Sequence, residues 1–383
     1  TISFRDVKIQ RRENDLVVGT FGRGIYILDD FSPLRQINEE NLKEEALLFP
    51  SRDALWYLPE RFHTSTHGDF EYQAENPDFG ATFTYYLRDG IKSLSEQRED
   101  QESEMEEKDR YPLYPSWEDL ETELREADPT VYLVIKNEQG NPIRKVNAEA
   151  EKGLHRVTWD LRLSSSRALG SGSSDDFGPL ASPGIYNATL FSNANGETRK
   201  LTDAVSFNVK PLSYGTIEGS VSPQERSAMM IDVSDLRRRL STANSKIDHL
   251  KAQLKSFRVA LDRSTAVTGD SEIRFEQLRQ EIFGIEEMIN GKRSSRGFGS
   301  SPATISSRLS MVELGRVNTW GLTDTQKQQM VYVQVALEEL EPKVDNLFNN
   351  DFPAFKKTLL EAGAPWIPDG LTDADSDEPE EMD

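Results

Sequence analysis

Two hydrophobic patterns follow each other along this chain, and the change between them lies near residue 215. Before it, short runs of β-branched and aromatic residues are separated by turns rich in Gly, Asn and Pro. After it, apolar residues recur every three or four positions over long stretches. Short β-rich runs are typical of strands, and the spacing of three and four is typical of helices. The pattern therefore predicts a multidomain β plus α protein.

The first β-rich runs lie close to the start of the chain. Residues 16–20 and 24–28 are separated by a turn that contains Gly22 and Gly24. Two such runs around a glycine-containing turn predict a β-hairpin. An isolated hairpin is marginally stable in water, so these strands need further partners. Residues 1–50 are therefore not expected to fold alone.

Further short strands are predicted within residues 51–215, around an acidic insertion at 94–128. Their connections contain turn-forming residues, as at 138–142 and 182–184. Several short strands with such turns indicate an antiparallel β-sandwich. The Gly/Ser-rich segment 164–178 is too polar for a strand and is predicted to be a long loop. The strands are expected at 82–87, 131–136, 155–161, 184–191 and 204–209.

One long apolar seam dominates the chain after residue 215. Its ten residues are spaced alternately by four and three positions, which predicts a helix over 223–262. Ser222 is suited to cap this helix, with Pro223 at its first position and Glu225 completing a capping box. The seam consists of Met229, Val233, Leu236, Leu240, Ala243, Ile247, Leu250, Leu254, Phe257 and Leu261.

Three more seams predict three further helices within residues 216–365. Gly291 is expected to end the second helix, and Thr323 with Gln326 to cap the fourth. Pro342 lies inside the fourth helix, where it removes one backbone hydrogen bond and is expected to bend the helix. Four seams indicate an antiparallel helical bundle, and a homodimeric coiled coil through the first seam is the alternative. The inward residues are Phe275, Leu278, Ile282, Ile285, Ile289, Ile305, Leu309, Val312, Met330, Val333, Leu337, Leu340, Val344 and Leu347.

The net negative charge of the chain is concentrated in three segments. The formal net charge of −21 comes from 45 Lys and Arg against 66 Asp and Glu. Residues 96–109 carry a net charge of −6, residues 117–128 one of −5 and residues 369–383 one of −8. Like charges repel, so the insertion is predicted to be exposed and 366–383 to be an acidic tail. Nucleic-acid binding and a transmembrane segment are not expected, because clustered basic residues and long apolar stretches are missing.

Candidate chemistry is sparse in this sequence. It contains no cysteine, which excludes disulfides and thiolate sites. His63 and His67 have the spacing of a helical metal pair, but a third ligand and helix-forming neighbours are lacking. Asp29 and Asp30 could orient a ligand at the end of a strand, although termination of a turn is the preferred interpretation. Trp159 is expected to anchor a core rather than to stack on a sugar. No catalytic, cofactor-binding or metal residue is therefore assigned.

The residues of the predicted hairpin, NDLVVGTFGRGIYILDD at 14–30, resemble the closing blade of bacterial sortilin-like β-propeller proteins. Those proteins are often labelled exo-sialidase-like or glycosyl-hydrolase repeat proteins. The family usually has His where this chain has Phe21. A stretch at 131–191 is also similar to Ig-like and fibronectin type III-like modules of secreted bacterial proteins. The sortilin-like resemblance continues at 81–87, 114–120, 153–162, 182–186, 305–309 and 362–366.

This resemblance implies that residues 1–50 are the closing segment of a β-propeller, that 51–215 form an Ig/fibronectin-like sandwich, and that 216–365 and 366–383 are the bundle and tail. It implies a non-catalytic C-terminal accessory or interaction region that binds protein, peptide or glycan. The implied partners are the upstream propeller of the same protein and other cell-envelope proteins. The implied location is extracellular, periplasmic or outer-membrane-associated in a bacterium. The alternative is a supporting part of a sialidase-like glycoside hydrolase whose active site lies in the propeller.

Overall fold

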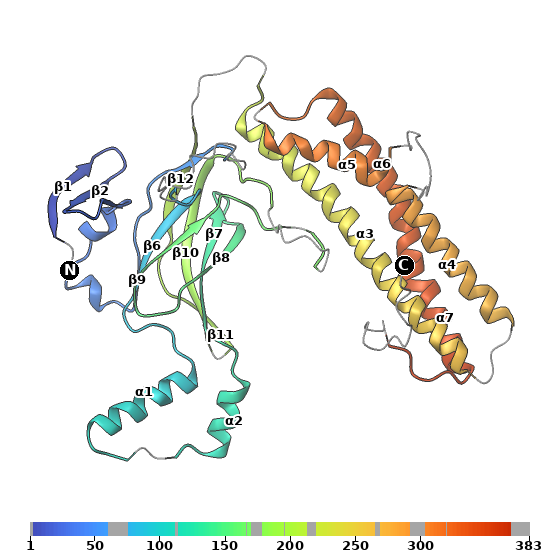
Figure 1. The fold of residues 1–383 in the computed structure, drawn as a ribbon, viewed down its shortest axis with the longest axis horizontal. Helices are drawn as coiled ribbons and strands as arrows, with labels where there is room; N and C mark the ends of the chain where they lie inside the picture. Colours follow the sequence, from blue (N-terminus) through green and yellow to red (C-terminus); the bar gives the residue numbers. More distant parts are fainter. Residues whose placement is uncertain are drawn as a thin grey trace. The chain divides into compact units, whose positions relative to one another are not determined.

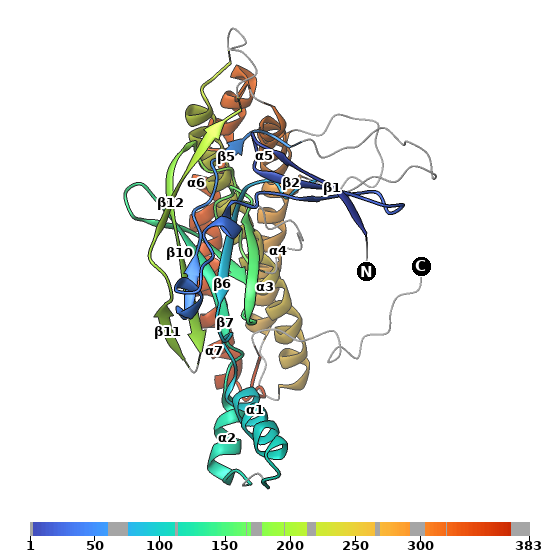
Figure 2. The same ribbon diagram turned by 90° about the vertical axis from the view of Figure 1, so that its left-hand side faces the viewer.

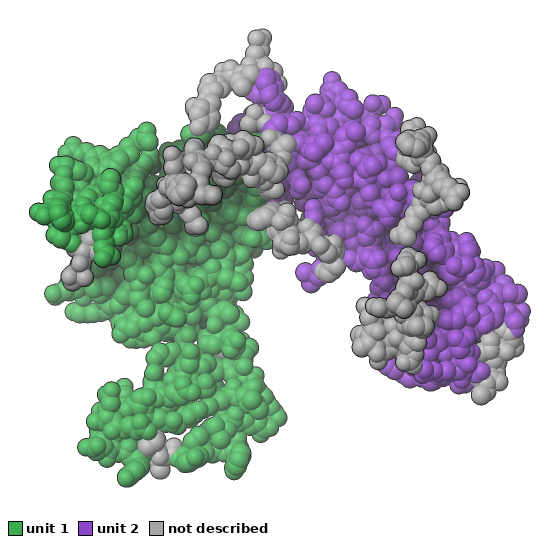
Figure 3. Space-filling model, viewed as in Figure 1, with its two compact units in different colours: residues 1–164, 180–215 green, residues 165–179, 216–383 purple. Residues whose placement is uncertain are grey.

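The protein combines strands in its first half with helices in its second half (Figure 1). The chain divides into two compact units, residues 1–164 with 180–215 and residues 165–179 with 216–383 (Figure 3). The change of unit after residue 215 lies where the hydrophobic pattern changes. The computed structural model describes residues 3–59, 76–111, 114–165, 167–169, 178–194, 196–212, 220–264, 269–291, 303–318 and 320–368.

The first unit begins with a three-stranded antiparallel sheet in the order β1-β2-β3. Its strands are β1 (Phe4–Gln10), β2 (Asp15–Thr20) and β3 (Ile25–Leu28). The predicted hairpin corresponds to β2 and β3, and β1 pairs with the other edge of β2. Gly22 and Gly24 form the turn between β2 and β3 with φ angles of 76° and 80°. Residues with a Cβ rarely adopt such angles, which explains both glycines.

Two further sheets make up most of the first unit. Their strands are β4 (Ala46–Leu48), β5 (Ala54–Trp56), β6 (Ala81–Leu87), β7 (Thr130–Asn137), β8 (Pro142–Ala148), β9 (Gly153–Trp159), β10 (Gly184–Ala194), β11 (Glu197–Lys200) and β12 (Val205–Pro211). One sheet has the order β5-β12-β10-β7-β8, with β11 also paired to β10, and the other has the order β4-β6-β9. Strands β5, β12, β10 and β7 are labelled in Figure 2.

One strand pair departs from the antiparallel arrangement that the sequence predicts. β5 runs parallel to β12, whereas the other pairs in these two sheets are antiparallel. No hairpin joins β5 to β12, because most of the first unit lies between them in the sequence. The direction of this pair is therefore not set by a tight turn, and the antiparallel prediction is wrong at this edge.

Buried residues of these two sheets form a single hydrophobic core. Trp159 is 1% exposed, and its indole Nε1 donates a hydrogen bond to the carbonyl of Arg162 at 2.8 Å. Its ring meets Tyr186 and Phe207 edge-on. The prediction that Trp159 anchors a core is therefore confirmed. Other fully buried members of this core are Phe83, Tyr85, Leu87, Leu133, Ile135, Leu161 and Leu190.

The acidic insertion between β6 and β7 folds into two helices, α1 (Leu94–Glu107) and α2 (Trp117–Arg125). Neither helix contains a buried residue. The prediction of an exposed insertion is confirmed for these helices, although the charge pattern alone did not indicate that they are helical.

The second unit is helical. Its helices are α3 (Pro223–Arg263), α4 (Gly269–Asn290), α5 (Ile305–Glu313), α6 (Asp324–Asn346) and α7 (Phe352–Glu361). A π-helical turn at Leu347–Asp351 joins α6 to α7, and Pro342 lies within α6. Short 3-10 helices of the chain lie at Ser32–Arg35, Asn41–Lys43 and Leu314–Val317.

The predicted helix ends are present. Ser222 Oγ accepts a hydrogen bond from the Glu225 backbone N–H at 3.1 Å, and Glu225 Oε2 accepts one from the Ser222 N–H at 2.9 Å. Thr323 and Gln326 form the same reciprocal pair at the start of α6. Gly291 follows α4 with a φ of 81°. The two capping boxes supply hydrogen-bond acceptors for backbone N–H groups that the start of a helix leaves unpaired. Gly291 adopts the left-handed conformation that ends α4.

The predicted seams meet in one hydrophobic core. Eight of the ten seam residues of α3 are buried, and Met229 and Leu254 pack against the same core while partly buried. The inward residues predicted for α4 and α5 are all buried, and so are those of α6 except Met330, which is partly buried. The α3 seam therefore packs against helices of its own chain.

Basic side chains beside the α3 seam reach acidic residues on neighbouring helices. Arg239 pairs with Glu341 of α6 at 2.8 Å, and Lys251 pairs with Glu286 of α4 at 2.8 Å. Arg237 pairs with Glu313 of α5. Because these pairs join different helices, they fix which helix faces lie together while the seam supplies the buried apolar area.

Candidate interaction surfaces

The two aspartates singled out in the sequence terminate a strand. Asp30 has a left-handed φ of 39°, and its Oδ1 accepts a hydrogen bond from the Ser32 backbone N–H at 3.2 Å. The backbone carbonyls of Asp29 and Asp30 accept hydrogen bonds from the guanidinium of Arg156 in β9. These contacts hold the chain that leaves β3 and fit the interpretation as a turn.

The histidines do not form a metal site in the described part of the chain. His63 and His67 lie outside the described residues. His155 and His249 each pack against an aromatic ring. Within the ranges that the structure describes, no three His, Cys, Asp or Glu side chains are placed to hold a metal ion.

Two core tyrosines have raised pKa values, and their surroundings explain why. Burial raises the pKa of Tyr85 to about 12, and its hydroxyl donates to the carbonyl of Glu149 at 2.8 Å. Burial also raises the pKa of Tyr186, whose hydroxyl donates to the carbonyl of Ser182. Both tyrosines are neutral core residues with a satisfied hydroxyl, which is the arrangement expected of structural tyrosines.

A cavity of about 370 Å³ lies beside the first turn of α4 and the start of α7. Arg274 in its wall pairs with Asp351 at 2.6 Å and with Glu281 at 3.5 Å. The positive charge in this cavity is therefore already balanced by carboxylates of the chain itself, which leaves little attraction for an anion.

The β1–β3 sheet is the largest departure from ordinary packing. None of its described residues is buried, although its strands are rich in apolar residues. Residues directly opposite each other in a sheet share a face. The register places Val7, Val18 and Tyr26 in one row and Ile9, Leu16 and Leu28 in the next. We call this surface, formed by these six residues, the Tyr26 face.

The opposite surface combines three apolar residues with an ion pair. Lys8, Val17 and Ile27 form one row, and Asp6, Gly19 and Ile25 form the next, with Lys8 and Asp6 paired at 3.6 Å. We call this surface, formed by these six residues, the Ile27 face. Tyr26 is 47% exposed and Ile27 is 62% exposed, so both faces are open within the described chain. Sheets that are apolar on both faces are normally covered on both.

Phe21 lies in the turn between β2 and β3. It is exposed, and the guanidinium of Arg5 lies 4.7 Å from the centre of its ring. The turn behind it is closed by Thr20, whose hydroxyl donates to the carbonyl of Gly24 at 2.7 Å. The aromatic side chain is therefore displayed on a turn of defined geometry.

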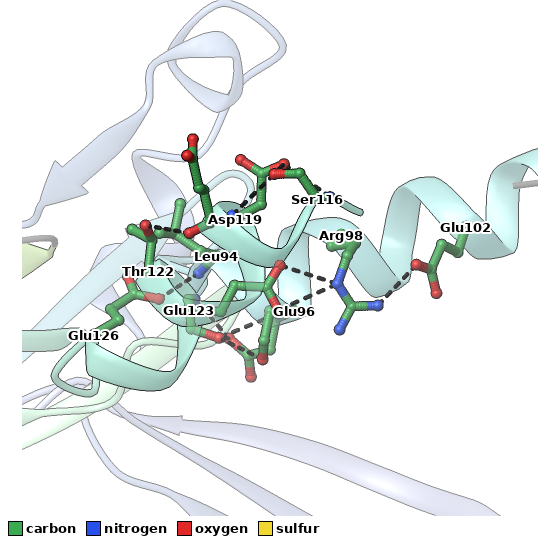
Figure 4. Close-up of polar contacts among 12 residues, drawn as sticks. Leu94, Glu96, Arg98, Glu102, Ser116, Asp119, Thr122, Glu123 and Glu126 are labelled. Carbon is green, nitrogen blue, oxygen red and sulfur yellow. Dashed lines mark hydrogen bonds and ion pairs between the residues drawn. The ribbon is translucent and has the colours of Figure 1, made fainter. Parts of the chain in front are cut away.

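The α1–α2 hairpin, residues 93–126, is held together by polar contacts (Figure 4). Arg98 Nε donates to both carboxylate oxygens of Glu123, at 3.0 and 3.2 Å, and Nη1 donates to Glu102 at 2.8 Å. These hydrogen bonds, above all those to Glu123, raise the pKa of Arg98. At the base of the hairpin, Glu126 Oε2 accepts from the backbone N–H of Leu94 at 2.6 Å.

Each helix of the hairpin also has its own capping box. Ser93 and Glu96 cap α1, and Ser116 and Asp119 cap α2. The charge of residues 117–128 alone does not indicate a helix. Two signals could have revealed more, namely this serine cap and apolar residues at helical spacing.

The apolar residues of α2 are Trp117, Leu120 and Leu124, at a spacing of three and four. Trp117 is 87% exposed and Leu124 is 86% exposed, and Leu120 is half-buried. Tyr111 and Tyr114, in the connection from α1, are exposed too. The hairpin thus displays apolar and aromatic side chains within an acidic surface.

Comparisons of the chain with models of protein families, with curated proteins and with solved structures give no match. The resemblance of residues 14–30 to a closing propeller blade therefore remains an expectation. Among the described helices, none combines the length and the apolar character that crossing a membrane requires.

Proposed function

We propose that this chain is a non-catalytic accessory and interaction region in which the β1–β3 sheet completes a β-propeller as its closing segment. The observation that carries the proposal is the exposure of apolar residues on both the Tyr26 face and the Ile27 face. Propeller blades are small sheets arranged around a central channel, so each blade lies between two others. A sheet that exposes apolar residues on both faces and has no core of its own fits that position.

The edges of the sheet support the same proposal. Propeller blades have four strands, and this sheet has three, with β1 and β3 at its edges. Both edge strands are exposed and contain large apolar residues, among them Phe4 and Ile25. Exposed apolar edges promote aggregation unless another strand pairs with them. We infer that a strand of the upstream propeller of the same protein supplies this pairing.

In this proposal the rest of the first unit and the helical unit are the accessory parts of the region. Residues 51–215 would be an Ig- or fibronectin type III-like sandwich, supported by the single core that two sheets share. Residues 216–365 would be an antiparallel helical bundle, supported by the common core of its seams. The whole would serve a secreted or cell-surface bacterial protein, in an extracellular, periplasmic or outer-membrane-associated location, and would bind protein, peptide or glycan there.

The test measures association between this chain and the propeller part that the proposal requires, expressed as a separate polypeptide. Tyr26→Lys changes one face of the sheet and Ile27→Lys changes the other. Ile185→Lys in β10 is the matched control, because Ile185 is also an exposed apolar strand residue. Each face variant should weaken association about tenfold or more, as for a residue at the centre of an interface, and the control should not.

Three results would contradict the proposal. Sensitivity of one face alone would indicate ordinary one-sided docking rather than a blade between two neighbours. Failure of the wild-type parts to associate, or the lack of any propeller sequence in the same protein, would exclude a closing segment.

All three variants should melt close to the wild type, because the substituted side chains are exposed. Release of sialic acid from sialosides by the intact protein would instead favour the glycoside-hydrolase alternative.

A further inference from the structure

The α1–α2 hairpin displays an apolar stripe whose two ends no other described part of the chain covers. Trp117, Leu120 and Leu124 follow one another at three and four positions, which places them along one side of α2. The two ends of the stripe, Trp117 and Leu124, are almost fully exposed. An amphipathic helix in a folded protein normally turns such a stripe toward a core.

The polar contacts of the hairpin leave the two ends of this stripe exposed. Glu123, which binds Arg98 of α1, and Leu124 are adjacent in sequence and so lie about 100° apart around the helix. A helix as short as α2 is marginal in isolation. The Arg98 contacts and the contact of Glu126 with the start of α1 therefore hold α2 in place without burying Trp117 or Leu124.

The charge around the stripe indicates what could cover it. Glu118 and Glu121 are exposed near the stripe, and Glu121 is ion-paired with the exposed Arg125, whereas residues 96–109 and 117–128 together remain strongly acidic. Nucleic acids and anionic lipid surfaces would be repelled. A partner that is apolar on one side and positively charged around it would match both features of the surface.

We propose that the apolar side of α2 is a docking site for a basic amphipathic segment of another protein. Apolar side chains of that segment cover Trp117 and Leu124, and its Lys or Arg residues lie against Glu118 and Glu121. Trp117 is the anchor, since tryptophan is enriched among the residues that dominate binding energy. The surface is separate from the β1–β3 sheet, so this proposal does not depend on the propeller-closing role.

The experiment selects binders for the full chain from a displayed library of short random peptides. The enriched peptides should combine several Lys or Arg residues with large apolar residues at helical spacing. The binding of a synthetic representative should weaken about tenfold or more in the double variant Trp117→Ser, Leu124→Ser. It should also weaken as ionic strength rises, because the charged groups are exposed and screened.

Two variants control for general effects of acidity and exposure. Trp366→Ser removes an exposed tryptophan from the second unit and should leave the peptide affinity unchanged. Glu118→Gln with Glu121→Gln keeps the apolar stripe and should weaken binding of the basic peptide. Enrichment of neutral or acidic peptides, equal binding to the Trp117, Leu124 variant, or no enrichment at all would overturn the proposal. Unchanged circular dichroism and melting temperature of the variants would show that the fold is retained.

Discussion

Two helices of this chain begin in the same way and reach opposite surroundings. Ser222 with Glu225 caps α3, and Ser116 with Asp119 caps α2. Both helices repeat apolar residues at three and four positions. The stripe of α3 is buried against the other helices of its unit, whereas Trp117 of α2 is exposed. Local signals therefore specify that a helix forms, and the supply of complementary faces decides whether its stripe is buried.

The same contrast separates two sets of strands. β6 and β3 are both rich in aromatic and β-branched residues. Phe83 and Tyr85 of β6 are fully buried between sheets, whereas Ile25 and Ile27 of β3 are exposed. β6 and β3 thus have a similar preference for the strand conformation, but other segments cover β6 and leave β3 exposed. The exposed members of each pair, the β1–β3 sheet and α2, are the surfaces to which we assign binding.

The largest expected effect lies on the buried side of the comparison. Leu250 is 1% exposed in the middle of the α3 seam, so Leu250→Ala removes core volume. The free energy of unfolding of the helical unit should fall by about 2–5 kcal/mol in urea denaturation. Lys251→Ala, one position away, should change it by less than about 0.5 kcal/mol because Lys251 is half-exposed and fills no core space.

Two outcomes would contradict this view of α3. Equal effects of Leu250→Ala and Lys251→Ala would mean that the seam is not buried as described. Conversion of a stable dimer to a monomer by Leu250→Ala, seen in sedimentation, would mean that the seam is an intermolecular coiled coil.

The helix caps should give a smaller effect, again with a matched pair. Ser222→Ala removes the oxygen that accepts from the Glu225 backbone N–H and should lower the stability of the helical unit by about 1 kcal/mol. Ser116→Ala removes the same contact from α2 and should leave global unfolding unchanged, because α2 contributes no buried residue. Faster amide exchange confined to α2 would then be the only consequence, and a global loss of stability would show that α2 supports the core.

The α3 cap also predicts a pH dependence. Hydrogen bonds from Ser222, first from its backbone N–H and then from its hydroxyl, lower the pKa of Glu225 below its usual value. A lowered pKa in the folded state means that the stabilisation is present above the unfolded pKa and is lost as pH falls through the folded pKa. NMR titration should therefore place the Glu225 midpoint below that of an exposed glutamate. Ser222→Ala should bring it only part of the way back, because the backbone donor remains.

The sequence predicts the helical unit well, because its signals are long and repeated. Eight of the ten seam residues of α3 are buried, the other two pack against the same core, and both predicted capping boxes are present. The fourth predicted seam ends at Leu347, and α7 was not predicted, although Phe352 and Phe355 continue the apolar residues beyond the π-helical turn. The π-helical turn changes the backbone hydrogen bonding but leaves no signal of its own in the hydrophobic pattern.

Several strands of the first unit were not predicted, and the reason differs between them. β4 and β5 have three residues each, which is too short for any alternation to be read. β8, at the edge of its sheet, has two adjacent charged residues, Arg144 and Lys145, and no clear alternation, and β11 is entirely polar. Their places are set by pairing with β7 and β10 rather than by their own composition.

The candidate surfaces were harder to predict than the cores. The hydrophobic pattern indicates that β3 and α2 have apolar sides, but it does not indicate whether those sides are covered. That property depends on which other segments reach them, as shown by Ile27 and Leu124, which remain exposed while Leu250 does not. Exposure of an apolar side is thus a result of tertiary structure, and it is the result on which both proposals rest.

Deletion of residues 96–109 tests the exposed side of the comparison. These residues form most of α1, which has no buried residue, and their net charge of −6 makes them repel one another. The melting temperature should change little, because no core is disturbed. A loss of more than about 2 kcal/mol would be as large as that caused by a defect in the core. It would contradict the description of this insertion as exposed.

The smallest effect is expected from a leucine-to-alanine substitution in α2, the counterpart of Leu250→Ala in α3. Leu124→Ala removes the same side-chain atoms as Leu250→Ala, but Leu124 is 86% exposed and touches no core. The free energy of unfolding should change by less than about 0.5 kcal/mol, within the range of ordinary surface substitutions. A loss comparable with that of Leu250→Ala would show that α2 is covered within this chain in solution. The apolar stripe would then belong to the fold rather than to a partner, and the docking proposal for α2 would fail.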